Sequence, residues 1–320
     1  MKIRLGYVAI ALKLPKVTAS SNVTFSYFSK LATEEKRLTK LKTVTRSNLD
    51  DLYTILKYNI ENEIHFYRIT SALVPLATHP EVNDWNYRDI FKKYFEVIGE
   101  YIKSNNLRVD THPDEFNVIN SAKPQVVQNT IRNLLFHSNF FEDIDYPEGK
   151  MVIHVGSGEG GKDVALERFI ENFKVLPKEI GTRFIIENDD KTYNARETLE
   201  LCTKIQRPMV MDIHHHKCNN TGEDILDMLN GAFNTWKGEV LKPKIHYSTP
   251  REFENDRKHA DYINGVEFVA FIERAKELNV DFDVMIEAKM KDLALYKLVE
   301  DIKVLRPNWK WEDNSTFIVK

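Results

Sequence analysis

The sequence predicts an α/β fold in which a chain of 320 residues closes into a single (β/α)8 barrel of the TIM type. Two observations predict this fold. Short apolar runs rich in β-branched residues alternate with stretches of helical period, and no long segment rich in Pro, Gly or Ser divides the chain. Because one barrel routinely takes up a chain of this length, residues 1–320 are expected to form a single domain.

The apolar runs are the expected strands, and they number eight along the chain: Ile3–Ile10, Ile64–Thr70, Leu107–Thr111, Met151–Val155, Arg183–Ile186, Met209–Ile213, Lys244–Tyr247 and Phe282–Ile286. Strands that alternate this regularly with helices form parallel sheets buried on both faces. Eight such units in one chain favour closure into a barrel over an open sheet.

The expected helices lie between these runs, where apolar residues recur at spacings of three and four. They cover residues 49–60, 90–102, 126–135, 164–173, 224–229, 265–278 and 292–305. A further helix is expected to begin after Asn194, because Glu197 follows three residues later and completes the pattern of a capping box.

The ends of strands three to eight carry side chains that bind metal ions: His112, His154, Glu187, Asp212 with the run His214, His215 and His216, then His246 and Glu287. The C-terminal ends of barrel strands form one ring, so these side chains are expected to converge at the C-terminal mouth. A single His or Glu at a strand end is usually hydrogen-bonded or solvated. Six successive strands that each supply one favour a metal site.

Within this set, Asp212 and His215 form the sharpest local pair, whereas the His214–His216 run is weak because at least one of the three must point away. Imidazole and carboxylate ligands without cysteine fit Zn²⁺ or Mn²⁺ and argue against an iron–sulfur cluster or a purely hard Mg²⁺ site. Glu187 and Glu287 are candidate bridging or inner ligands, which implies at least two ions. Such ions activate water and clamp the attacking and leaving oxygens of a phosphodiester.

Several other signals have a structural interpretation of equal or greater weight. His137 is expected to be a packed or partly exposed helical residue, His65 a core or supporting residue inside a strand, and His79 is ambiguous. GSGEGGK at 156–162 lacks the Walker A pattern and predicts a flexible turn. The basic stretch Lys30–Arg46 fits a DNA path or a solvated face, and Trp236 is expected to pack rather than to stack on a base.

Composition and charge exclude few function classes. A net charge of −3 neither indicates nor excludes nucleic-acid binding, because the local field decides it. The two cysteines, Cys202 and Cys218, give no disulfide framework, so a cytoplasmic location is expected. The N-terminal MKIRLGYVAI carries charges and predicts a strand rather than an export signal, and no apolar window approaches the ~18 residues of a membrane span.

The ordered motifs resemble the UV damage endonucleases and, more distantly, the endonuclease IV-type abasic-site nucleases. The resemblance rests on LGY, THP, VIHVGS, IIEND, MDIHHH, PKIHYS, KHADY and DVMIEAK, which cover roughly residues 1–290. It implies a barrel nuclease with a cluster of divalent ions, chiefly Mn²⁺; two or three ions are expected, with Zn²⁺ or Mg²⁺ as alternatives. The protein is expected to be a monomer. Its substrate would be UV-damaged double-stranded DNA, nicked immediately 5′ to cyclobutane dimers and 6-4 products to start excision repair.

Position by position, the resemblance implies metal ligands at His112, His154, Glu187, Asp212, His215, His246, His259 and Glu287. Lys244 corresponds to a lysine that is carboxylated in some members, and with Glu187 and Glu287 it forms the implied catalytic set; the alternative is an ordinary buried or paired lysine. The implied contacts with DNA or the lesion are Tyr7, His79, Glu115 and Phe116.

One segment departs from the family pattern. The family often has His-Pro-Gly-Gln-aromatic after strand three, where this chain has His112-Pro113-Asp114-Glu115-Phe116. The phenylalanine retains a ring that can wedge between bases, whereas the glutamate brings a negative charge toward phosphates. Ala11 also stands about where the family has an asparagine.

Two other functions fit a ring of metal ligands in a barrel. A metal-dependent sugar isomerase would have a closed pocket for a small molecule and no affinity for DNA. A non-catalytic DNA-binding barrel with structural ions would bind DNA tightly without turnover. The order of the motifs favours the nuclease, since the fold alone does not decide function.

Overall fold

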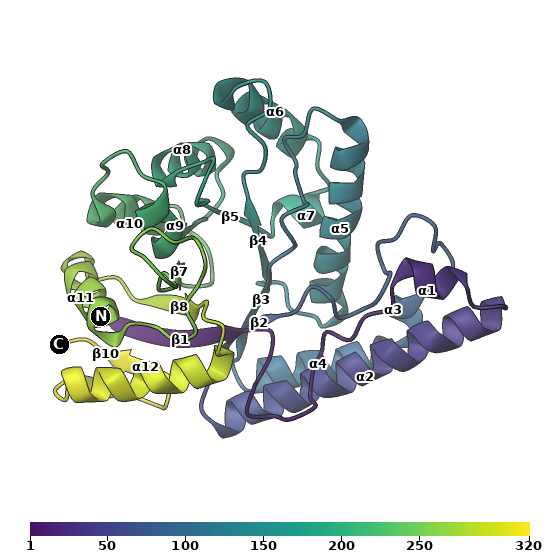
Figure 1. The fold of residues 1–320 in the computed structure, drawn as a ribbon, viewed down its shortest axis with the longest axis horizontal. Coiled ribbons are helices and arrows are strands. Elements are labelled where there is room, and N and C mark those ends of the chain that lie inside the picture. The colour runs from purple at the N-terminus through teal and green to yellow at the C-terminus, as the bar shows by residue number, and fades with distance from the viewer.

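The structure, a computed structural model, describes residues 1–320 and contains eight parallel strands closed into a barrel (Figure 1). The strands are β1 (Lys2–Val8), β2 (Phe66–Ile69), β3 (Arg108–Thr111), β4 (Lys150–His154), β5 (Phe184–Glu187), β6 (Met209–Asp212), β7 (Lys244–Tyr247) and β8 (Phe282–Ile286). All eight predicted strands and the predicted fold class are confirmed.

The barrel closes through β1, which pairs with β8 along its length and with β2 at its C-terminal end. The closing register joins Tyr7 to Tyr67 and Val8 to Arg68. Around the ring the order is β1-β2-β3-β4-β5-β6-β7-β8, so strands four positions apart face each other across the interior. In particular, β3 lies opposite β7.

A C-terminal hairpin, which was not predicted from the sequence, pairs with the N-terminal half of β1, where β1 does not pair with β2. It consists of β9 (Lys310–Trp311) and β10 (Thr316–Ile318), and β10 runs antiparallel to β1 from Lys2 to Arg4. The Ser315 hydroxyl donates a hydrogen bond to the Glu63 carbonyl at 2.7 Å, just before β2 begins. These strands are two and three residues long, too short for a periodic signal.

The helices surround the barrel: α1 (Phe25–Ser29), α2 (Glu34–Glu61), α3 (Tyr87–Ile90), α4 (Lys92–Ser104), α5 (Pro124–Asp143), α6 (Lys162–Lys174), α7 (Lys178–Gly181), α8 (Ala195–Ile205), α9 (Ile213–Cys218), α10 (Ile225–Asn234), α11 (Gly265–Ala275), η1 (Lys276–Leu278) and α12 (Lys291–Leu305). The capping box predicted at Asn194 and Glu197 is present at the start of α8. None of the helices combines the length and apolar character that crossing a membrane requires.

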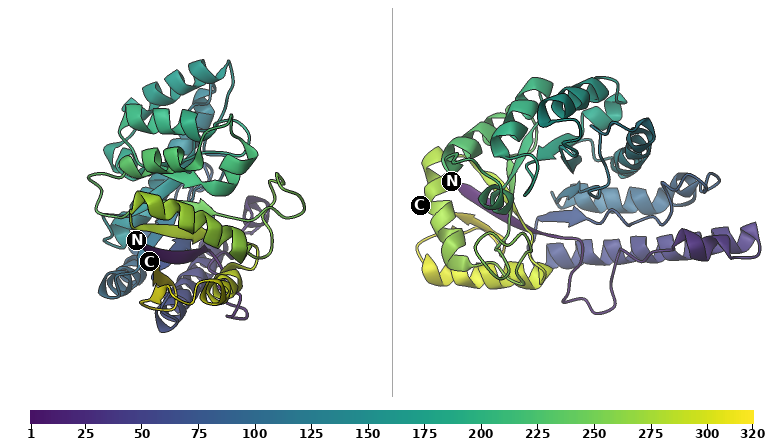
Figure 2. Two further views of the ribbon diagram at one scale, coloured as in Figure 1. Left: turned by 90° about the vertical axis from the view of Figure 1, so that its left-hand side faces the viewer. Right: turned by 45° about the horizontal axis from the view of Figure 1, so that its top comes forward.

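Most of the basic stretch Lys30–Arg46 lies in the first turns of α2, and this part of the helix extends with α1 beyond the barrel (Figure 2, right). Asn48 anchors the helix where it meets the barrel, because its side-chain amide donates to the Leu73 carbonyl at 3.0 Å, shortly after β2 ends. Since helices of a βα barrel run back from the C-terminal mouth, the turns before Asn48 rise on the side of that mouth.

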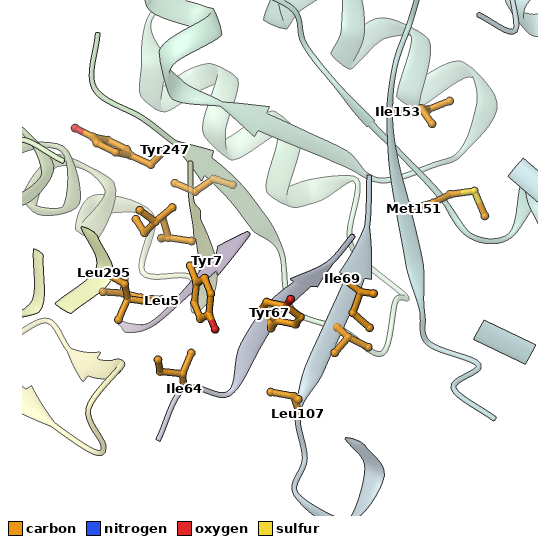
Figure 3. Close-up of a cluster of buried hydrophobic side chains, with 14 of the residues drawn as sticks. Leu5, Tyr7, Ile64, Tyr67, Ile69, Leu107, Met151, Ile153, Tyr247 and Leu295 are labelled. Carbon is orange, nitrogen blue, oxygen red and sulfur yellow. The ribbon is translucent and has the colours of Figure 1, made fainter. Parts of the chain in front are cut away.

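The core is apolar between the barrel wall and the surrounding helices, and small apolar clusters also lie on the inner face of the strands. Figure 3 shows Tyr7 of β1 beside Tyr67 of β2, and their ring centroids are 5.3 Å apart. Trp236 packs against Val152, Ile185 and Val210, and its indole nitrogen donates to the Met209 carbonyl at 2.7 Å. The packing role expected for this tryptophan is therefore confirmed.

Candidate metal centre

Glu187, at the end of β5, lies at the centre of a group of histidines and is only 1% exposed. Its Oε2 lies 3.0 Å from His112 Nε2 and 3.8 Å from His154 Nε2. Its Oε1 lies 2.8 Å from His246 Nδ1 and 3.4 Å from His215 Nδ1. One carboxylate thus contacts imidazoles from four different segments of the mouth, which is the arrangement that a bridging ligand needs.

Asp212 and His215 lie next to this carboxylate, at the point where β6 ends and α9 begins. The strand stops at Asp212, whose carboxylate caps α9 by accepting from the His215 backbone N–H at 2.7 Å. Asn188 holds both residues: its amide pairs with the Asp212 backbone in both directions, and its own carbonyl lies 2.9 Å from His215 Nδ1. This leaves His215 Nε2 and the second oxygen of Asp212 available to an ion.

On the other side of Glu187, Glu287 follows β8 and contacts two rings. Its Oε1 lies 3.3 Å from His246 Nδ1, and its Oε2 lies 4.0 Å from His259 Nδ1. Arg68 of β2 binds the same Oε1 at 2.5 Å and approaches His246 Nε2 at 2.6 Å. His259, the ligand with the weakest sequence signal, thus lies beside Glu287, in the loop between β7 and α11.

The other two histidines of the α9 run point away from this group, as expected for part of the run. His214 is buried, with its Nε2 4.0 Å from Cys218 Sγ and its ring 5.3 Å from that of His259. His216 is buried as well, and its Nδ1 has no hydrogen-bond partner. Of the three, only His215 faces Glu187.

Burial and neighbouring charges set the protonation of the ring. Burial lowers the pKa of His246 to about 4, so its imidazole is neutral and ready to bind a cation. Burial also raises the pKa of Asp212 to about 7. Burial favours protonated Glu187 as well, but the surrounding histidines outweigh it and hold its pKa well below the usual range. For His215, burial opposes the charge while Asp212 and Glu187 outweigh it, raising its pKa well above the usual value.

These residues fit divalent ions. Three overlapping groups each bring their ligand atoms within 4.8 Å of one another: His112, His154 and Glu187; Glu187, Asp212 and His215; Asp212, His246 and Glu287. The buried Oδ2 of Asp212 has no hydrogen-bond partner, which a cation would supply. Glu187 and Asp212 each belong to two groups, so the arrangement suits more than one ion.

Below the ring, a second set of buried charges fills the barrel interior. The Lys244 ammonium of β7 donates to the Asp110 carboxylate of β3 across the barrel. Deeper still, Asp283 of β8 accepts from Arg108 at 2.6 Å and from Arg4. Burial lowers the pKa of Lys244 to about 8 despite its carboxylate partner, so an appreciable fraction of the amine is neutral near neutral pH.

The four residues expected to touch DNA lie at different depths. Glu115 and Phe116 are exposed in the loop after β3, and the phenylalanine is 78% exposed. His79 lies half-buried in the loop after β2, stacked on Phe25 with ring centroids 4.0 Å apart. Tyr7 is fully buried, and its hydroxyl donates to Asn59 Oδ1 at 2.6 Å. Glu115 and Phe116 therefore lie at the surface of the mouth, whereas the Tyr7 side chain packs between β1 and α2 on the outer side of the barrel wall.

The structure also shows where His137, His65 and the glycine-rich segment 156–162 lie. His137 is packed within α5, where burial lowers its pKa to about 3. His65 does not lie inside a strand as expected: it precedes β2 at the opposite end of the barrel, 3.9 Å from Asp313. The glycine-rich segment forms the turn before α6; Gly156 has a φ of +105°, and the Asn120 side chain accepts from the Ser157 N–H at 2.8 Å. That segment is a turn held by Asn120.

The sequence reading missed two residues that organise the ring, Arg68 and Asn188. Arg68 is the one strongly charged residue inside the apolar FYRI strand, a signal that could have identified it. Asn188 follows Glu187 directly and had no separate signal, because an asparagine after a strand is common in turns. Arg68 reaches from β2 to ligands of β7 and β8, whereas Asn188 holds a ligand of the adjacent strand β6.

Comparisons with known proteins agree with this geometry. A family model described as UV-endonuclease UvdE matches residues 3–309. A UV DNA damage endonuclease of Bacillus cereus (strain B4264) is 42% identical over 308 residues, which cover 96% of each chain. One of Bacillus anthracis (strain A0248) is 40% identical over the same share.

Solved structures agree as well. A crystal structure described as SacUVDE superposes with a TM-score of 0.84 at 35% identity, covering 95% of this chain and 99% of that one. Endonuclease IV from Thermus thermophilus superposes with a TM-score of 0.52 at 13% identity, covering 95% of this chain and 98% of that one, a likeness of fold alone. With a family match over nearly its whole length and curated relatives above 40% identity, the chain belongs to the UV-endonuclease UvdE family.

Proposed function

We propose that this protein hydrolyses one phosphodiester bond of double-stranded DNA immediately 5′ to UV photoproducts, namely cyclobutane dimers and 6-4 products, and so starts their excision. In this reaction a water oxygen bonds to phosphorus as the bond to the 3′ oxygen breaks, leaving a 3′ hydroxyl and a 5′ phosphate. The observation that carries the proposal is Glu187, whose two oxygens contact four imidazoles in a chain of the UvdE family.

Divalent ions, with Mn²⁺ the best match to this mixture of nitrogen and oxygen ligands, would be held by His112, His154, Glu187, Asp212, His215, His246, His259 and Glu287. When bound, two or three such ions supply Lewis acidity for the water and the phosphate oxygens. The buried, orphaned oxygen of Asp212 supports this assignment, because leaving it without a cation is costly.

The residues of the chain position these groups. Arg68 holds Glu287 in place at 2.5 Å, and Asn188 orients His215 through its carbonyl. We assign Lys244 a positioning role beneath the ring, where its lowered pKa keeps a neutral fraction that can add CO₂ and become a carbamate, with release of a proton. Its pairing with Asp110 holds the nitrogen in the barrel interior, directly below the mouth.

Recognition of the lesion is proposed to lie with the loop after β3. Phe116 is exposed enough to stack into a locally unstacked duplex, and a photoproduct lowers the cost of extruding its bases. Glu115 is the neighbouring contact to the duplex. We assign His79 to the side of the mouth formed by the loop after β2. Tyr7, which is buried against Asn59 of α2, is assigned a supporting role behind β1 rather than a direct contact.

A nicking assay on supercoiled plasmid tests the proposal. The protein, first stripped with a chelator, is incubated with UV-irradiated or unirradiated plasmid, with and without added Mn²⁺. We expect relaxed circles only from the irradiated plasmid and only when Mn²⁺ is added. An end-labelled linear duplex, irradiated in the same way, should give fragments that end immediately 5′ to each dimer. Equal cutting of both plasmids would remove the claim of damage specificity, and cutting in excess chelator would remove the metal assignment.

A further inference from the structure

Two loops that follow barrel strands each carry an exposed Glu–Phe pair. In the loop after β3 the pair is Glu115–Phe116, and in the loop after β7 it is Glu252–Phe253. Both rings are largely in solvent, since Phe116 is 78% and Phe253 is 66% exposed. The first pair was anticipated from the sequence, whereas the second has no role in the function proposed above.

An aspartate side chain braces each of these two loops. In the first, Asp114 Oδ1 accepts from the Phe116 backbone N–H at 3.1 Å. In the second, the buried Asp256 accepts from the N–H groups of Glu252 at 3.2 Å and Lys258 at 3.0 Å. These bonds close each loop around its aromatic tip. Phe253 is therefore displayed by a braced hairpin rather than left on a loose segment.

The hairpin of Phe253 is also joined to the metal centre. At the base of the hairpin, Pro250 and His259 form an isolated antiparallel β-bridge, and the Arg251 N–H donates to the Lys258 carbonyl at 2.9 Å. His259 lies next to Glu287 in the ring. Arg257 in the same hairpin reaches Asp190 after β5 at 3.3 Å. The position of Phe253 relative to the ring is thus set by contacts at both ends of the hairpin.

The two loops follow strands on opposite sides of the barrel. Their strands, β3 and β7, are four positions apart in a barrel of eight, and Asp110 and Lys244 from the same two strands pair across the interior. Between the loops lies the ring itself, in which His112 after β3 and His246 in β7 have centroids 6.2 Å apart. A substrate held over the ring would have one phenylalanine on each side.

We propose that Phe253 is a second aromatic contact to damaged DNA, facing Phe116 across the metal centre. The inference rests on the proposed function. A photodimer joins two adjacent bases, so its extrusion empties two layers of the stack, each about 3.4 Å deep. One phenyl ring fills about one such layer, and a duplex with a two-layer gap offers stacking surface to a second ring.

The charge around Phe253 indicates stacking rather than phosphate binding. Its neighbours Glu252 and Glu254 are acidic, Arg251 pairs with Glu252 at 4.0 Å and Arg257 with Asp190 at 3.3 Å, while the exposed Lys258 lies at the base of the hairpin. Because the residues on both sides of Phe253 are acidic, its own contribution to binding is expected to come from the ring. Loss of the ring is therefore expected to weaken binding without changing its dependence on salt, since that dependence counts phosphate contacts.

The test uses the full chain with Phe253→Ala, Phe253→Trp and Val304→Ala. Val304 is 80% exposed near the end of α12, at the opposite end of the barrel, and serves as the matched control. The probes are a labelled duplex with one thymine cyclobutane dimer and the same duplex undamaged. Fluorescence anisotropy with chelator-stripped protein, which cannot cut the probe, measures its affinity for each duplex at several salt concentrations. Thermal melting checks that each variant is folded.

We expect Phe253→Ala to bind the dimer duplex roughly tenfold more weakly, with an unchanged salt slope and little change on undamaged DNA. Phe253→Trp should bind within about threefold of the parent, because stacking needs only an aromatic face. Equal affinities of Phe253→Ala and Val304→Ala for the dimer duplex overturn the inference, as does a reduced salt slope. Failure of the parent protein to nick irradiated plasmid overturns the proposed function instead, and absence of any DNA binding overturns both.

Discussion

Two buried charged clusters lie one above the other in the barrel, and they are neutralised differently. In the deeper cluster, Asp110 and Asp283 are matched by cations of the chain itself, such as Lys244 and Arg108. At the mouth, the acidic groups are Glu187, Asp212 and Glu287, and Arg68 is the only arginine or lysine that contacts any of them. Burial without a matching cation is costly, so the upper cluster suits ions from solution and the lower one does not need them.

The difference separates activity from stability. The lower cluster is expected to support the barrel whether or not metal is bound, because its partners are fixed in the chain. The upper cluster is expected to govern catalysis and metal affinity and to weaken the metal-free fold. Four predictions, from the largest effect to the smallest, test this separation.

Glu187→Gln is expected to lower the rate of nicking at least about 10³-fold, because an amide cannot bridge cations as a carboxylate does. Binding of damaged duplex should stay within about threefold of the parent. Single-turnover nicking and anisotropy measure the two effects. Glu159→Gln, in the exposed turn before α6, is the matched control and should cut normally. Undiminished cutting by Glu187→Gln would remove this residue from the centre.

Asp110→Ala is expected to destabilise the fold by about 3–5 kcal/mol, because the buried Lys244 ammonium loses its carboxylate partner. The loss should be similar with and without Mn²⁺. Chemical denaturation monitored by circular dichroism gives the free energy of unfolding. Glu171→Ala breaks a surface pair with Lys174 and should cost less than about 1 kcal/mol. A loss seen only in chelator would show that the lower cluster also depends on metal.

Asn188→Ala is expected to weaken Mn²⁺ binding by about 10–100-fold, because it removes the side chain that holds Asp212 in position. Titration calorimetry on chelator-stripped protein measures this affinity. The exposed Asn129→Ala should leave it unchanged. An equal affinity in both variants would mean that the Asp212 backbone is held by the barrel without help from this amide.

Mn²⁺ affinity is expected to rise about tenfold per pH unit between pH 5 and 7. The pKa of Asp212 is about 7, so below that value an ion must displace its proton. The same raised pKa favours the metal-free fold at low pH, a contribution that fades as the pH rises from about 4 through 7. Asp212→Asn should make the profile shallower, with the remaining slope due to the proton on His215, whose pKa is raised as well, whereas exposed Glu200→Gln should leave the slope unchanged. Calorimetry at each pH is the measurement. A flat profile in the parent protein contradicts this assignment.

The barrel strands could be predicted from the sequence because of their residue pattern. The eight barrel strands have four to seven residues, and most of them lie in apolar runs, so the parallel barrel and the segments at its mouth could be predicted from periodicity and chain order. The strand-end histidines and acids stood out because polar residues interrupt apolar runs there. The β9–β10 hairpin left no such pattern, and neither did the placement of His65 outside β2.

By itself, the sequence determined the fold class, the convergence of metal-binding side chains at one end of the barrel and the family resemblance. Local periodicity and residue order are enough for these properties. The tertiary structure alone decided that Glu187 contacts four imidazoles and that Arg68 joins the two charged clusters, since it binds Glu287 at 2.5 Å and lies 3.5 Å from Asp110. It also decided that the loops of Phe116 and Phe253 follow strands on opposite sides of the barrel. These are contacts between strands and loops far apart in the chain, and they depend on barrel closure, which brings β3 opposite β7.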